Sequence, residues 1–149
     1  MKDYKEFQFG WLIFAFAIPT QILITYLYVN DLGDRPIGQT GFAIASSMFL
    51  LLYLLFYGLT TKISVDNISV SFGVGLIRKR ISIKRISTVE SVKTPWYYGW
   101  GIRFIPNGML YNVSGTDGVE LKFNDTRRVF RIGTKDSIKL KEEIAKRIK

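Results

Sequence analysis

The sequence contains neither cysteine nor histidine. Without cysteine there are no thiolate nucleophiles or thiolate metal sites, and without histidine the commonest general base and every histidine-dependent triad are lost. The remaining acids, Asp and Glu, do not pair at a spacing of two residues on any expected strand. The sequence therefore predicts a non-enzymatic protein with no catalytic residue, no metal and no cofactor. The lack of cysteine also fits a reducing compartment.

Charged residues are missing from two long stretches, residues 7–30 and 36–61, with a five-residue segment between them. About 20 apolar residues in a helix cross a hydrocarbon core of about 30 Å, and so short a connection returns the second helix beside the first. We expect a transmembrane hairpin in residues 1–61, with spans at about 8–29 and 37–59. Ion and proton pathways usually need ionisable groups inside the membrane, so the hairpin is predicted to be an anchor.

The N-terminus also has features of a cleavable signal peptide, since Lys2 and Lys5 precede the apolar run and Ala15-Phe16-Ala17 follows within it. The apolar run continues to Val29, which favours an uncleaved span. Inside the hairpin, Gln21 is expected to bond to the second helix, and a patch of small residues (Gly41, Ala45 and Ser46) allows close packing.

Basic residues are concentrated after the hairpin. Residues 62–149 carry 18 Lys and Arg against 8 Asp and Glu. Lys and Arg near a span are retained on the cytoplasmic side, so the pattern predicts a multi-pass protein of the cell membrane with both termini in the cytoplasm.

From Lys62 onward, apolar and polar residues alternate between turn signals such as Asp66-Asn67 and Gly73-Val74-Gly75, which predicts about seven short strands. Thr134 or Asp136 can cap a final amphipathic helix that runs to about Ile148. The chain is therefore predicted to be α+β.

Seven short strands followed by one amphipathic helix is the order of a pleckstrin-homology-like (PH-like) domain. The segments 94–103 (TPWYYGWGIR), 110–115 (LYNVSG) and 131–134 (RIGT) resemble small bacterial two-span membrane proteins with such a domain. The resemblance implies a transmembrane α-helical hairpin followed by a PH-like antiparallel split β-barrel, residues 62–149, capped by a C-terminal helix. Eukaryotic PH domains that bind phosphoinositides carry basic residues at the first hairpin loop. Asp66-Asn67 has none, which argues against that specificity.

Five basic residues within eight positions form the first candidate site: Arg78, Lys79, Arg80, Lys84 and Arg85. Each Lys or Arg near an anionic leaflet contributes about 1 kcal/mol, so three or four of them would press the domain onto lipid headgroups. On a strand, Arg78 and Arg80 face one way and Lys79 the other. A solvated strand face is the alternative. Because the chain is expected to be tethered to a membrane, nucleic acid is not predicted as a partner.

The second candidate site is rich in aromatic residues and glycine, and it consists of Trp96, Tyr97, Tyr98, Trp100 and Arg103. These rings either fill the open mouth of the barrel or form an exposed face that inserts at a membrane interface or binds a protein. The predicted function is a membrane-anchored interaction or scaffolding module, with its basic face toward anionic lipid and its aromatic loop toward a protein partner or a second copy. The alternative is a lipid or small-ligand binder that uses the barrel mouth around Trp96 to Arg103.

Overall fold

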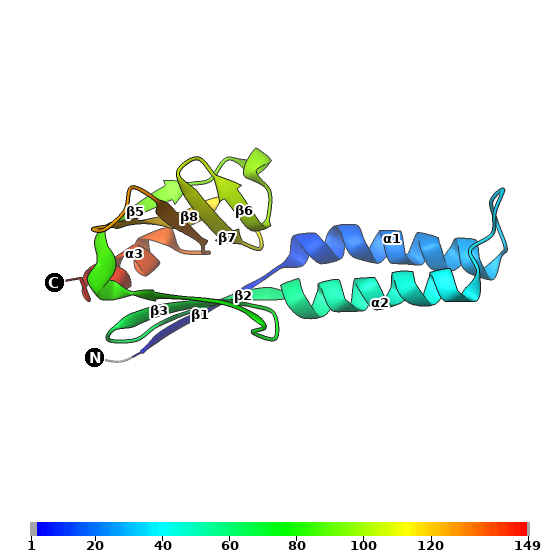
Figure 1. The fold of residues 1–149 in the computed structure, drawn as a ribbon, viewed down its shortest axis with the longest axis horizontal. Helices are drawn as coiled ribbons and strands as arrows, with labels where there is room; N and C mark the ends of the chain where they lie inside the picture. Colours follow the sequence, from blue (N-terminus) through cyan, green and yellow to red (C-terminus); the bar gives the residue numbers. More distant parts are fainter. Residues whose placement is uncertain (1–2, 149) are drawn as a thin grey trace.

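The structure is a computed structural model that describes residues 3–148. Two apolar helices project from a body that consists of two β-sheets and a short C-terminal helix (Figure 1). The helices are α1 (Trp11–Val29), α2 (Gln39–Phe56) and α3 (Ser137–Ala145). The first sheet contains β1 (Tyr4–Phe9), β2 (Gly58–Ile63), β3 (Asn67–Phe72) and β4 (Ile77–Ser82). The second contains β5 (Ile86–Lys93), β6 (Gly101–Ile105), β7 (Gly108–Asn112), β8 (Asp117–Phe123) and β9 (Val129–Gly133).

Along the sequence, α1 and α2 lie between β1 and β2, which are neighbouring strands of the first sheet. This sheet is antiparallel throughout, in the order β1-β2-β3-β4, and Phe9 of β1 lies opposite Gly58 of β2. The strand pair therefore continues directly into the helix pair (Figure 1). At the transition, the amide of Gly10 donates to the carbonyl of Tyr57 at 2.9 Å.

The two helices are shorter than the expected spans at the ends nearest the body. The first helix begins at Trp11 rather than at residue 8, and the second ends at Phe56 rather than at residue 59. Residues 4–9 are uniformly extended because they pair along their whole length with β2, and this pairing overrides the local apolar pattern. The first sheet thus includes residues on both sides of position 62.

The second sheet is mixed and has the order β5-β8-β9-β7-β6. Its β7 and β9 run parallel, with Leu110 opposite Arg131, while the other neighbouring strands are antiparallel. The expectation of a wholly antiparallel barrel is therefore wrong. The described strands form two separate sheets around a shared core, which includes Phe72, Tyr111 and Ile132.

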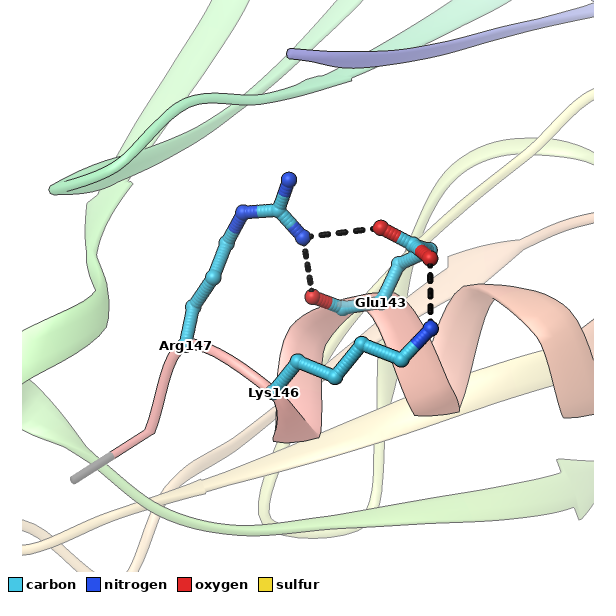
Figure 2. A network of polar contacts seen from close by, with 3 residues as sticks. All are labelled: Glu143, Lys146 and Arg147. Carbon is cyan, nitrogen blue, oxygen red and sulfur yellow. Dashed lines mark hydrogen bonds and ion pairs between the residues drawn. The ribbon is translucent and has the colours of Figure 1, made fainter. Parts of the chain in front are cut away.

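The C-terminal helix α3 covers β5 and β8 and places Leu140 and Ile144 in the core. Asp136 caps it, accepting a hydrogen bond from the amide of Lys139 at 2.9 Å. At its other end, Glu143 binds both Lys146 and Arg147, each at 2.9 Å (Figure 2). The hydrogen bonds from Arg147 and then Lys146 lower the pKa of Glu143.

The two long helices contact each other through a polar and an aromatic pair. Gln21 donates to the hydroxyl of Ser46 at 3.1 Å, which confirms the bond expected between the helices. Nearer the connecting loop, the rings of Tyr28 and Phe42 stack with centroids 4.2 Å apart. Both helices are long and apolar enough to cross a membrane, and of all their residues only Ala17 is buried.

Candidate functional site

The aromatic segment connects opposite edges of the second sheet. It leaves β5 at one edge and enters β6 at the other, so it crosses the width of the sheet. On the way it forms a short 3-10 helix, Trp96–Tyr98, in which neighbouring rings meet edge to face. Trp96 and Tyr97 are 74% and 67% exposed. Tyr98 and Trp100 are half-buried outside the main core.

This aromatic crossing lies at the end of the body from which the helices project (Figure 1). The indole of Trp100 donates to the carbonyl of Gly115 at 3.3 Å. The neighbouring Ser114 donates through its hydroxyl to the carbonyl of Phe9 at 3.2 Å and accepts at its own carbonyl from Gln8 at 2.8 Å. The 113–115 turn therefore links the aromatic crossing to the last residues of β1.

A groove of about 670 Å³ separates residues 99–103 from the two long helices. The helices contribute mainly apolar side chains to its wall: Leu12, Ile13, Phe16, Phe49, Leu52 and Phe56. Arg103 provides the only charged side chain among the lining residues. The groove is thus apolar along the helices and cationic where it meets the body.

The backbone around the groove determines where the Arg103 side chain lies. Gly99 has φ +74°, and a Cβ there would lie 3.3 Å from Nε of Arg103. That Nε donates to the carbonyl of Trp100 at 2.9 Å. Among the described residues no carboxylate lies within ion-pair distance of Arg103, so its charge remains available to an anion.

The five basic residues of the first candidate site do not form one patch. Arg78 is near the β3–β4 turn, which contacts the end of α2 through a bond from the Val74 amide to the Leu54 carbonyl at 3.2 Å. Lys84 and Arg85 lie beyond the other end of β4, in the 3-10 helix Ile83–Arg85. Six strand residues span about 20 Å, which is more than a Debye length of about 8 Å. A membrane at the helix end would therefore attract Arg78 far more than Lys84 or Arg85.

Some of these basic residues line a second groove, of about 780 Å³, together with residues outside the two candidate sites. Lys79 and Arg80 belong to β4, Arg85 belongs to the 3-10 helix after it, and Arg127 and Arg128 belong to the segment before β9. In the sequence, the adjacent pair Arg127-Arg128, shortly after Asn124-Asp125, could have been selected as a further basic site. The sequence does not reveal that these arginines lie across a groove from β4.

Two carboxylates from different strands do lie opposite each other. Glu90 of β5 is the register partner of Glu120 of β8. Each is bound to a cation, Glu90 to Lys122 at 2.7 Å and Glu120 to Arg131 at 2.6 Å. The hydrogen bond from Lys122 to Glu90 raises the pKa of Lys122. Within residues 3–148, no three acidic residues gather into a group that could hold a metal ion.

No protein-family model, no curated protein and no solved structure matches this chain.

Proposed function

We propose that this chain is a two-span membrane protein that binds an anionic lipid at the junction between its hairpin and its cytoplasmic body, without catalysing a reaction. The observation that carries the proposal is the groove beside residues 99–103. Its apolar wall belongs to the two long helices, and its cationic end is Arg103. An acyl chain fits the apolar wall, and an anionic headgroup fits the cationic end at Arg103.

The surface of the hairpin supports membrane insertion. Phe16 is 70% exposed, Met48 is 66% exposed, and neither helix carries an ionisable group apart from its tyrosines. Soluble proteins rarely expose continuous apolar surfaces larger than a few hundred Å². Hydrocarbon would remove this surface from water at about 25 cal/mol per Å².

The position of the groove supports a lipid as its ligand. Its volume is within the range of about 300–1,000 Å³ that is typical of small-molecule sites. Trp11 lies at the start of α1 and Tyr57 directly follows α2, as expected for side chains at a membrane interface. Arg103 is then at headgroup depth, where a cation attracts anionic lipid.

We further propose that the body is a PH-like domain on the cytoplasmic side. Support comes from the two sheets around one core, the helix α3 packed over one part of it, and the excess of Lys and Arg after the hairpin. Extraction of membranes with carbonate should leave the intact chain in the pellet. A reporter fused to the C-terminus should be active only in the cytoplasm. Release by carbonate, or activity outside the cell, would contradict this topology.

The lipid site can be tested with the full chain in nanodiscs that contain phosphatidylcholine and phosphatidylglycerol. Native mass spectrometry should detect retained phosphatidylglycerol. Arg103→Gln should reduce this retention about fivefold while leaving phosphatidylcholine unchanged, since one interfacial cation contributes about 1 kcal/mol. Thr20 of α1 also lines the groove, and Thr20→Phe, which fills the space beside the apolar wall, should reduce retention of both lipids. Arg127→Gln removes the same charge elsewhere and serves as the control. Equal retention in all three variants would disprove the site.

A second candidate function is a membrane-anchored interaction module whose aromatic loop binds a protein partner or a second copy. The exposure of Trp96 and Tyr97 favours it. A photo-crosslinking residue at position 97 should then capture one defined protein in native membranes. Crosslinking to lipid alone would favour insertion of the loop into the membrane interface.

A further inference from the structure

The second groove, the basic groove, follows the free edge of strand β4. Among residues 3–148, β4 pairs only with β3, so its other edge has no strand partner. Three consecutive residues, Lys79–Ile81, line the groove. Because side chains alternate between the two faces of a sheet, three in a row indicate that the groove borders the edge of β4 rather than one of its faces.

The positive charge of this groove is largely uncompensated. Arg85 is bound to Asp125 at 2.8 Å. The other four basic residues that line the groove make no ion pair within the described chain: Lys79, Arg80, Arg127 and Arg128. None of the lining residues is acidic. The ligand that best complements this surface is therefore an anion with several charges.

Apolar side chains line the same groove as the basic ones. Met109, Phe123 and Phe130 contribute to the lining, together with Phe104, which is 87% exposed. A ligand that presents charged and apolar groups alternately would satisfy both kinds of surface. An extended peptide does this, because its successive side chains point in opposite directions.

The groove also reaches the end of the body away from the helices. Arg85, which lines the groove, lies in the 3-10 helix after β4. Its carbonyl accepts a hydrogen bond from the amide of Asn124 at 2.9 Å. The β3–β4 turn at the opposite end of the strand contacts α2. A ligand in this groove would therefore come from the aqueous phase rather than from the bilayer that holds the hairpin.

We propose that the basic groove binds an extended acidic segment of a partner protein, which adds to the first sheet as a strand beside β4. The free N–H and C=O groups of the strand edge supply backbone hydrogen bonds to the peptide. Lys79 and Arg80 on one side, with Arg127 and Arg128 on the other, select its Asp and Glu residues. This site is separate from the lipid groove and does not depend on it.

The test uses the full chain in phosphatidylcholine nanodiscs and a fluorescein-labelled octapeptide of alternating Glu and Val, with fluorescence anisotropy as the measurement. The peptide should bind saturably. The double variant Arg127→Gln/Arg128→Gln should weaken binding about tenfold. Both side chains are exposed, so this variant should fold normally, and Lys79→Gln provides an independent variant on the opposite wall.

Four comparisons, with a variant in α3, two altered peptides and a single-stranded oligonucleotide, decide between specific and general attraction. Lys139→Gln/Lys141→Gln removes the same charge from α3 and should change the affinity by less than about twofold. A peptide of alternating Gln and Val should bind weakly, and N-methylation of alternate amides along one edge of the Glu peptide should abolish binding. Equal loss in the α3 variant, no effect of N-methylation, or tighter binding of a single-stranded oligonucleotide than of the peptide would each overturn the proposal.

Discussion

The carboxylate of Glu6 accepts a bifurcated hydrogen bond from the hydroxyl of Thr134, which lies 2.7 and 2.8 Å from its two oxygens. Glu6 also accepts a bond from the amide of Lys135 at 3.0 Å. Since Glu6 is on β1 and Thr134 follows β9, this contact joins the two sheets just before α3. The strand that leads into the first long helix is thereby fixed to the body at a further place, in addition to its pairing with β2 and its bonds to Ser114.

Replacing Glu6 should therefore destabilise the body. Glu6→Ala leaves the hydroxyl of Thr134 and the amide of Lys135 without this acceptor, and we expect the free energy of unfolding to fall by about 1–3 kcal/mol. Glu6→Gln keeps one acceptor oxygen and should cost less. Denaturation of the full chain in detergent, monitored by tryptophan fluorescence, measures the difference in the free energy of unfolding. Glu142→Ala, an exposed acid on α3, is the control, and an equal effect of both alanine variants would contradict the role of Glu6.

The neighbouring Tyr4 should make stability depend on alkaline pH. Its hydroxyl donates to Glu6 at 3.1 Å. Burial, and then the nearby carboxylate of Glu6, raise the pKa of Tyr4 well above its ordinary value of 10.0. The folded chain keeps this proton where the unfolded chain loses it. The contribution to stability is complete below about pH 10 and is lost as the pH rises from there toward the folded-state pKa.

Tyr4→Phe should accordingly reduce the fall in the free energy of unfolding between about pH 9 and about pH 11. Part of the fall should remain, because burial also raises the pKa of Tyr111. Unfolding midpoints at several pH values provide the measurement, and tyrosinate absorbance shows which rings ionise. An unchanged pH dependence in Tyr4→Phe would show that Tyr4 does not titrate differently in the folded chain.

Local pattern predicted the helices much better than it predicted the sheets. The uncharged stretches and the amphipathic C-terminus indicated α1, α2 and α3, because each of these helices is determined largely by its own residues. The strand Tyr4–Phe9 was missed because its partner, β2, begins only after the hairpin. The parallel pairing of β7 with β9 depends on tertiary arrangement and leaves no periodic signal in either strand.

The residues of the candidate sites could be predicted from the sequence only in part. The sequence predicted Arg103 and the aromatic segment as candidates, but the groove beside them is also lined by side chains from α1 and α2, such as Phe16 and Phe49. It grouped Arg78 with Lys84 by proximity along the chain, whereas an extended strand places them far apart. Arg127 approaches β4 only through the arrangement of the two sheets.

The contact between the β3–β4 turn and the hairpin depends on a glycine. Gly73 has φ +48°, and a Cβ there would lie within van der Waals overlap of the Leu54 and Leu55 carbonyls. Gly73→Ala should therefore push the turn away from α2 and lower the free energy of unfolding by about 1–3 kcal/mol. Gly38→Ala, where nothing lies near the added Cβ, should have little effect. Comparable destabilisation by both substitutions would show that close packing at Gly73 is unimportant.

Exposure of Trp96 at the helix end of the body predicts that its ring enters the membrane interface. In a variant with Trp11→Phe and Trp100→Phe, the fluorescence of Trp96 should be quenched by lipids brominated close to the headgroup more strongly than by lipids brominated near the chain ends. The control carries Trp96→Phe as well, with its single tryptophan introduced by Lys141→Trp on the exposed face of α3. This reporter should be quenched by neither lipid. If Trp96 is quenched no more than the reporter on α3, the aromatic segment does not reach the bilayer, and its exposed rings are then available to a protein partner.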